Sequence, residues 1–184
     1  MEENIKLEKE YKIPVDVFRE GYKAYQKKKV IPKSTVIAVI FLILAANFVY
    51  GAVKAPDNYL AYLLIFVCLF MAVRQWYNPR KARRSYVESF AEMGEPLYRL
   101  SVADTYAEIA TISAAPVIEA FDSEGNTVED PLPAPQRLEY SAGLSVQEGD
   151  TFFLLISGDS MVYIVPKEGF TSAEQEILRN IGKK

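Results

Sequence analysis

The sequence predicts an α+β membrane protein in which a transmembrane helical hairpin is joined to a small antiparallel β-barrel closed by a C-terminal helix. Two apolar runs without a charged residue, 34–53 and 59–73, lie close together in the first half of the chain and predict the hairpin. After residue 96 the chain changes to short stretches of alternating apolar and polar residues separated by turn sequences, which predict the β domain.

The first apolar run has the length of a membrane span. It covers residues 34–53 and is bracketed by Lys33 and Lys54. At about 1.5 Å of rise per residue, a helix of this run is roughly 30 Å long, which matches the hydrocarbon core of a bilayer. We therefore predict that this run crosses a membrane.

The second apolar run reads as the return leg of the same hairpin. Residues 59–73 are apolar, and the run reaches full length when the amphipathic residues 75–77 form its interfacial end. The predicted spans are thus about 34–53 and 59–77. Pro56, in the short connection 54–58, stops a continuous helix and favours a turn.

The flanking charges predict the orientation of the hairpin. Basic residues precede the first span and follow the second: Lys23, Lys27, Lys28, Lys29, Lys33, Arg74, Arg80, Lys81, Arg83 and Arg84. The connection between the spans holds only Lys54. By the positive-inside rule both termini are cytoplasmic, in a multi-pass protein of the cell membrane.

The two apolar runs lack the ionisable residues that transport proteins place within the membrane. Neither apolar run contains an ionisable residue, and such residues usually mark ion or substrate paths in membranes. Asn47 is the one strongly polar residue deep in a span, and we expect it to hydrogen-bond to the neighbouring helix. Ala38, Ala45 and Ala52 recur every seven residues and predict a face for close helix packing. The hairpin is therefore interpreted as an anchor.

Four segments make up the predicted domain organisation. They are a cytoplasmic strand and amphipathic helix at 1–33, the hairpin at 34–77, a juxtamembrane basic helix at 78–95, and a cytoplasmic β domain with a C-terminal helix at 96–184. Within the first segment, alternation predicts a strand near 6–13, and helical spacing predicts a helix over 15–29 that runs along the membrane or directly into the first span.

The β domain is predicted as six or seven short strands followed by one helix. The expected strands are 97–103, 106–112, 116–121, 126–129, 138–147, 151–157 and 161–166, with turns at 122–125, 148–150 and 158–160. The order of the Pro-rich, acidic segment 113–136 is left open. Thr171 and Glu174 form the capping-box pattern that predicts the start of the last helix, with Ala173, Ile177, Leu178 and Ile181 on one face.

Charge and composition exclude several functions. Residues 1–90 hold 15 Lys and Arg against 8 Asp and Glu, whereas residues 91–184 hold 6 against 16. The acidic second half would repel nucleic acid. There is no histidine, and Cys68 is the single cysteine, so His-based nucleophile systems and cysteine-rich metal sites are excluded. We assign no catalytic, metal-binding or cofactor-binding residue and no cofactor.

The order of these parts resembles the YcxB-like family of bacterial two-transmembrane proteins. The resemblance lies in the opening segment EYKIPVDVFREGYKAY, in the hairpin, and in the final stretch LSVQEGDTFFLLISGDSMVYIVPKEGFTSAEQEILR, with its Ile164-Val165-Pro166-Lys167-x-x-Phe170 motif. The resemblance implies a bacterial cell-membrane protein whose C-terminal domain is similar to pleckstrin-homology domains. It implies no catalytic residue. The acidic, Pro-rich middle of this chain departs from the family pattern.

One motif raises an enzymatic alternative. Ser157-Gly158-Asp159-Ser160-Met161 resembles the nucleophile box of serine proteases that pair Ser with Lys, in which case Ser160 would be the nucleophile and Lys167 the general base. The favoured interpretation is a Gly-Asp turn between two strands, because the strand spacing requires a turn there in any case.

Two ligand-binding alternatives are disfavoured. The acidic residues Asp122, Glu124, Glu129 and Asp130 lack the fixed spacing of a calcium loop. Phosphoinositide binding near Pro166 and Lys167 would need several clustered basic residues, and the domain offers only Arg99, Arg137, Lys167 and Arg179 before its C-terminal end. Pro166 and Lys167 are expected to end an edge strand.

The leading hypothesis is a non-enzymatic, membrane-anchored interaction module whose acidic domain binds another protein, one with a basic surface, at the cytoplasmic face of the membrane. The predicted partners are the lipid bilayer and that protein, with a homo-oligomer as a further possibility and no nucleic acid. Two alternatives remain, namely protection against a membrane-acting or secreted toxin, and a hydrolase that uses Ser160 and Lys167.

Overall fold

The computed structural model describes residues 5–113, 119–121, 127–129, 132–158 and 161–182. The chain divides into two compact units. One, the helical unit, is Lys23–Tyr86, and the other, the β unit, combines Met1–Tyr22 with Val87–Lys184.

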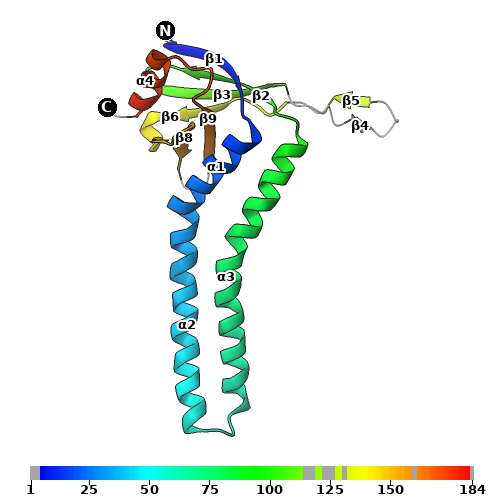
Figure 1. Cartoon of the computed structure of the whole chain (residues 1–184), viewed down its shortest axis with the longest axis vertical. Helices are drawn as coiled ribbons and strands as arrows, with labels where there is room; N and C mark the ends of the chain where they lie inside the picture. The colour runs from blue at the N-terminus through cyan, green and yellow to red at the C-terminus, as the bar shows by residue number, and fades with distance from the viewer. Residues whose placement is uncertain (1–4, 114–118, 122–126, 130–131, 159–160, 183–184) are drawn as a thin grey trace. The chain divides into compact units, whose positions relative to one another are not determined.

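The helical unit is an antiparallel pair of long helices. Helix α1 (Val15–Tyr25) is followed by a π-helical turn, η1 (Gln26–Val30), and then directly by α2 (Ile31–Lys54). Helix α3 (Tyr59–Glu92) returns beside α2 (Figure 1). The turn between α2 and α3 is where the sequence predicts it. The predicted second span and juxtamembrane helix are one continuous helix, which includes Pro79.

Small side chains form the seam between α2 and α3. Ala45 and Ala52 are 4% and 5% exposed, which confirms the predicted alanine face, and Ala38 is half-buried. Ala61 and Cys68 are buried on α3 and are likewise seven residues apart. Small residues are typical of the facing sides of paired membrane helices. Cys68 therefore has a packing role.

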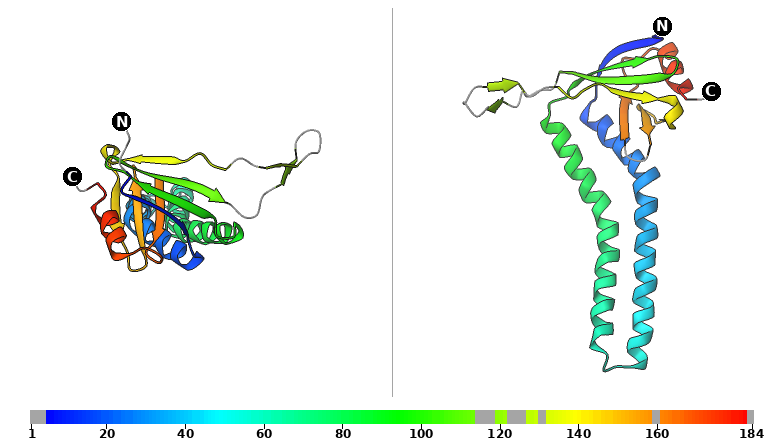
Figure 2. Two further views of the ribbon diagram at one scale, coloured as in Figure 1. Left: turned by 90° about the horizontal axis from the view of Figure 1, so that it is seen from above. Right: turned by 180° about the vertical axis from the view of Figure 1, so that it is seen from behind.

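The β unit contains two larger antiparallel sheets. In the first, the strand order is β1-β2-β3-β6, with bounds Leu7–Lys12, Leu97–Val102, Tyr106–Ser113 and Gln136–Glu139. In the second, the order is β7-β8-β9, with bounds Ser145–Glu148, Phe152–Ser157 and Met161–Pro166. Figure 2 shows that the strands of the two sheets run across each other. A separate two-stranded sheet pairs β4 (Glu119–Phe121) with β5 (Thr127–Glu129).

The structure does not contain the predicted closed barrel, and the difference arises within residues 138–147. The expected single strand 138–147 is divided by a short 3₁₀ turn, Tyr140–Ala142, and by Gly143, whose φ is 80°. Glycine adopts this left-handed conformation without the steric penalty that a Cβ imposes. The chain leaves the first sheet after β6 and enters the second at β7, so these two sheets are separate and, with the β4–β5 pair, the described strands form three sheets and no closed barrel.

The core of the β unit lies around β8. Residues 152–156 of this central strand are all buried, as expected for a strand covered on both faces. Helix α4 (Ser172–Asn180) places Leu178, which is fully buried, against the unit. The predicted capping box is confirmed, because Glu174 N–H donates to Thr171 Oγ1 and Thr171 N–H donates to Glu174 Oε2.

The N-terminal residues complete the β unit. β1 pairs with β2 from Leu7 opposite Val102 to Lys12 opposite Leu97. Lys9 Nζ lies 2.8 Å from Glu174 Oε2 on α4. A Cβ added to Gly21 would lie 2.9 Å from Ile164 Cδ1, so glycine allows this part of α1 to pack against β9. Segments from both ends of the sequence therefore share one core.

Candidate functional site

A groove of about 810 Å³ opens on the β unit between the β2–β3 turn, β6 and α4. Its lining residues are Lys6, Val102, Ala103, Asp104, Thr105, Glu139, Tyr140, Ser141, Ala173, Glu176, Ile177, Asn180, Ile181 and Gly182. The volume lies in the range of ligand-binding clefts in proteins. We refer to this feature as the α4 groove.

Apolar side chains of α4 contribute to the groove. The sequence predicts Ala173, Ile177, Leu178 and Ile181 on one face of the last helix. In the structure Leu178 and Ile181 are buried, whereas Ile177 is half-buried and Ala173 is exposed, and both of these line the groove. The core of the β unit therefore covers only part of the apolar face of α4, and the rest of that face lines the groove.

The charged groups of the groove are mostly acidic. Three carboxylates, those of Asp104, Glu139 and Glu176, stand against one ammonium, that of Lys6, which forms an ion pair with Asp104. Asn180, the last residue of α4, also lines the groove. The carbonyl end of a helix carries a partial negative charge and favours cations. Glu139 Oε1 also lies 3.9 Å from Arg137 Nε, so two of the three carboxylates have a cation beside them. The groove therefore combines apolar walls with negative charge that is concentrated at Glu176 and the end of α4.

Tyr140 connects the two loops that flank the groove. Its hydroxyl donates to the carbonyl of Ala103 at 2.9 Å, and its backbone N–H donates to the carbonyl of Thr105 at 3.0 Å. Burial, and then the negative charge of Asp104, raise the pKa of Tyr140 to about 12. The phenol keeps its proton at neutral pH, so this connection persists and the groove wall is held in place.

A separate ion network lies on the β unit around Glu148. Lys167 Nζ is 2.7 Å from Glu148 Oε1, while Arg179 Nε is 2.9 Å from Oε2 and its terminal nitrogen 2.8 Å from Oε1. Both cations also lie near the ring of Phe153. The hydrogen bond from Arg179 and then that from Lys167 lower the pKa of Glu148 to about 2. The network links β7, the end of β9 and α4.

Most of the residues that the enzymatic and calcium alternatives require lie outside the described residues. Ser160, Asp122, Glu124 and Asp130 lie outside those residues, as do the turn 122–125 and part of the segment 113–136. Lys167 is the base in the Ser-Lys hypothesis. Its side-chain ammonium donates to Glu148 Oε1, and its backbone N–H donates to the carbonyl of Thr151. Within the described residues, no group of three His, Cys, Asp or Glu side chains could hold a metal ion.

In the helical unit, α2 and α3 are long and apolar enough to span a membrane. Many of their large apolar side chains are exposed, among them Val39, Ile40, Ile43, Val53, Leu60, Leu63, Phe66 and Phe70. The core helix of a soluble protein would bury such residues. This surface is the second candidate functional feature of the chain.

Two hydrogen bonds cross the seam near Pro79. A proline has no N–H, so Pro79 leaves the carbonyl of Gln75, four residues earlier, without its helical donor. The hydroxyl of Ser34 on the other helix donates to this carbonyl at 2.5 Å. Gln26 Nε2 donates to the carbonyl of Pro79 at 2.7 Å. The pair of helices thus supplies the partner that proline removes, as happens in membrane helices.

Asn47 differs from its prediction. Its side chain is exposed on α2, and within the described residues it has no hydrogen-bond partner, so the predicted bond to α3 is wrong. Ser34 and Gln26, which no pattern in the sequence distinguishes, make the interhelical hydrogen bonds instead. Alternation of apolar residues gives no information on which way a single polar residue faces within an all-apolar helix.

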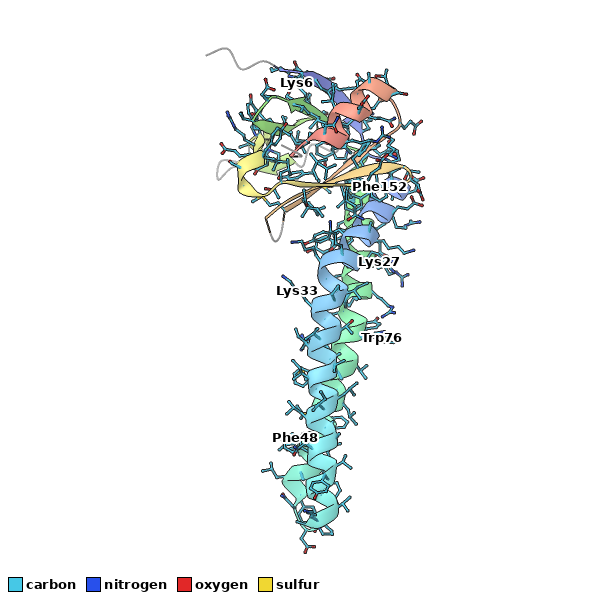
Figure 3. The ribbon with its side chains drawn as sticks, turned by 90° about the vertical axis from the view of Figure 1, so that its left-hand side faces the viewer. Lys6, Lys27, Lys33, Phe48, Trp76 and Phe152 are labelled. Atoms are coloured by element: carbon cyan, nitrogen blue, oxygen red, sulfur yellow. The ribbon has the colours of Figure 1, made fainter. Side chains whose placement is uncertain are left out.

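The basic residues gather at one end of the helical unit. Figure 3 shows Lys27, Lys33 and Trp76 toward the end opposite the α2–α3 turn, and Phe48 closer to the turn. Because α2 and α3 are antiparallel, the basic residues before α2 and those in the second half of α3 lie at the same end, with only Lys54 beside the turn.

Comparison with known proteins gives no match for this chain among protein-family models, curated proteins or solved structures.

Proposed function

We propose that this chain is a non-enzymatic binding module anchored in the bacterial cell membrane. The helical unit crosses the bilayer with both termini in the cytoplasm, and the β unit binds a basic, amphipathic segment of another protein in the α4 groove. Membership of the YcxB-like family and similarity to pleckstrin-homology domains belong to this proposal. They are supported by the order of the parts, a helical hairpin followed by antiparallel strands and a closing helix.

Two features of the helical unit support the anchor. Its large apolar side chains face outward along α2 and along residues 59–77 of α3, and lipid is the environment in which such a surface is stable. Its basic residues stand at the end opposite the turn, where an anionic cytoplasmic leaflet would attract them. The turn itself is too short to form a domain.

The composition of the α4 groove supports the choice of partner, and this observation carries the proposal. Ile177 and Ala173 offer apolar contact, while Glu139, Glu176 and the carbonyl end of α4 offer negative charge. A segment with an apolar face and flanking Lys or Arg residues complements both. Nucleic acid and anionic lipid headgroups carry the charge that this groove repels.

The test is photo-crosslinking in living cells from a benzoylphenylalanine placed at Ile177 of the full chain, followed by mass spectrometry of the crosslinked peptide. We expect one dominant protein, crosslinked through a segment rich in Lys or Arg. The double substitution Glu139→Lys with Glu176→Lys should abolish this crosslink, because it makes the groove repel the partner.

Asp150→Lys is the matched control. Asp150 is exposed on the β unit and does not line the groove, so this substitution should leave the crosslink unchanged. An equal yield of the same crosslink in the double variant would contradict the proposed groove. A crosslinked peptide without basic residues would contradict the proposed partner.

A further inference from the structure

We propose that two copies of this chain associate through one face of α2, centred on Asn47. This inference rests on the proposed membrane crossing and goes beyond it, because it assigns a second interface that is distinct from the α4 groove. We call the line of Ile43, Asn47 and Gly51 the Asn47 face.

Asn47 is placed where an unpaired amide is unfavourable. It lies seven residues before Lys54, the last residue of α2, which is about 10 Å along the helix. At that depth a spanning helix is surrounded by hydrocarbon, which offers no hydrogen bond. The side chain is exposed and has no partner within the described residues. The described part of the chain therefore leaves the amide available to a second molecule.

The chain's own α3 lies on the other side of α2. At about 100° per residue, Asn47 points roughly 200° around the helix from Ala45, which is buried in the seam with Ala52. The same geometry places Ile43 and Gly51 beside Asn47, one turn before and one turn after it. The Asn47 face is therefore directed away from the intramolecular seam.

Gly51 gives this face a second property of a helix interface. A Cβ added to Gly51 would have nothing within 4 Å, so no close packing inside the chain accounts for the glycine. Glycine lowers the stability of a helix interior, yet it lets the backbone of a neighbouring membrane helix approach closely. It lies one turn from the only strongly polar side chain in the span. The two observations point to the same occupant, a second helix.

The carboxamide itself favours a second copy of the same helix. It carries both a donor and an acceptor, so two Asn47 side chains related by a two-fold axis saturate each other reciprocally. Lipid saturates neither group. Lys33 and Lys54 lie on the same side of the helix as Asn47 but at the two ends of the span, where water and salt screen their charges. Between them no charged side chain interrupts the face.

The experiment measures energy transfer in liposomes between full-length chains labelled at the C-terminus with a donor or an acceptor dye. The protein should show transfer that saturates with acceptor fraction, as a dimer does. Asn47→Leu should weaken association at least about tenfold, whereas Asn47→Gln, which keeps the carboxamide, should largely retain it. Phe66→Leu, on an exposed position of α3, is the matched control and should behave as the unchanged protein does.

Resistance to carbonate extraction is measured on the same liposomes. A chain that resists extraction but gives no transfer, or an Asn47→Leu variant that associates as well as the unchanged protein, overturns the Asn47 face alone. A chain that is extracted overturns the membrane crossing as well. Crosslinking from position 47 in cells to a helix of a different protein, without self-crosslinks, overturns the second copy as occupant.

Discussion

Glu148 is the residue at which three elements of the β unit are joined electrostatically. Glu148 is the last residue of β7. Its carboxylate accepts hydrogen bonds from Lys167, just after β9, and from Arg179 on α4. A similar arrangement fixes the start of α4, where hydrogen bonds from Lys9 and from the backbone of Thr171 lower the pKa of Glu174. Both carboxylates are stabilised in their charged form.

The pH dependence of stability should therefore contain a component from Glu148. Its pKa falls from an ordinary value of 4.5 to about 2 on folding, so the stabilisation is fully present above about 4.5 and is lost as pH falls toward 2. Glu148→Gln should lower the thermal unfolding midpoint at pH 7, and the gap from the unchanged protein should narrow between these two pH values. Far-UV circular dichroism of the full chain in detergent measures the midpoints.

Glu168→Gln is the control for this measurement, since Glu168 is exposed on the turn after β9. It should shift the midpoint little at either pH. A gap between Glu148→Gln and the unchanged protein that stays constant from pH 7 to pH 2 would show that the ion network does not stabilise the fold.

At the residue scale, local patterns were predictable and long-range partners were not. The capping box needs only Thr171 and Glu174, three residues apart, so the sequence identifies it. The partners of Glu148 are 19 and 31 residues away along the chain, and any of the many acidic residues could have paired with them. The direction of Asn47 was predicted wrongly, because an apolar helix gives no periodic signal to orient it.

At the scale of elements, the two prolines near one end of the helical unit are accommodated in different ways. Pro32 lacks the N–H that would bond to Lys28 in an α-helix, and the π-helical turn, in which the Ile31 N–H bonds to Gln26, comes directly before it. Pro79 remains inside α3, where Ser34 hydrogen-bonds to the carbonyl that it leaves free. Before Pro32 the backbone changes to π-helical hydrogen bonding, and at Pro79 the Ser34 hydroxyl replaces the missing backbone donor. Both helices are therefore continuous.

Removing the hydroxyl of Ser34 should loosen the pair of helices. Ser34→Ala leaves the Gln75 carbonyl without a donor, and we expect a loss of about 1 kcal/mol in the free energy of unfolding, the usual size of such bonds in membranes. Thr35→Ala is the matched control, because the Thr35 hydroxyl donates to Ile31 within its own helix. Unfolding in sodium dodecyl sulfate from mixed micelles measures both variants. Equal losses would contradict a special role for Ser34.

The elements themselves were largely predictable, and their assembly was less so. Long apolar runs and alternating stretches predict α2, α3, β8 and β9 because each pattern repeats within a few residues. The division of 138–147 depends on the left-handed conformation of Gly143, which a strand-like pattern conceals. The α4 groove joins segments from residue 6 to residue 182, so no local signal in the sequence could locate it.

At the scale of the whole molecule, charge is separated between the two units. The helical unit holds 11 Lys and Arg against one acidic residue, whereas the β unit holds 10 against 23. The separation is sharper than the division into halves at residue 90, because the N-terminal segment belongs to the acidic unit. A basic helical unit and an acidic β unit agree with the proposed anchor and with the proposed basic partner.

The proposed topology can be tested with single cysteines in a Cys68→Ser background. Asn58→Cys, in the turn before α3, should react with a membrane-impermeant maleimide in intact cells. Asp150→Cys, in the β unit, should react only after the membrane is permeabilised, because both termini are proposed to be cytoplasmic. The reverse labelling pattern would invert the topology, and labelling of both positions in intact cells would contradict membrane crossing.

The shortness of the α2–α3 turn has a consequence for biogenesis. Only residues 55–58 separate the two helices. In the proposed topology, the polar residues that must cross the membrane are therefore Lys54, Asp57 and a few neighbours. The two helices can enter the bilayer together as one preformed insertion unit, with their seam already closed. No folded domain has to be exported, and the β unit can fold on the side where the ribosome releases it.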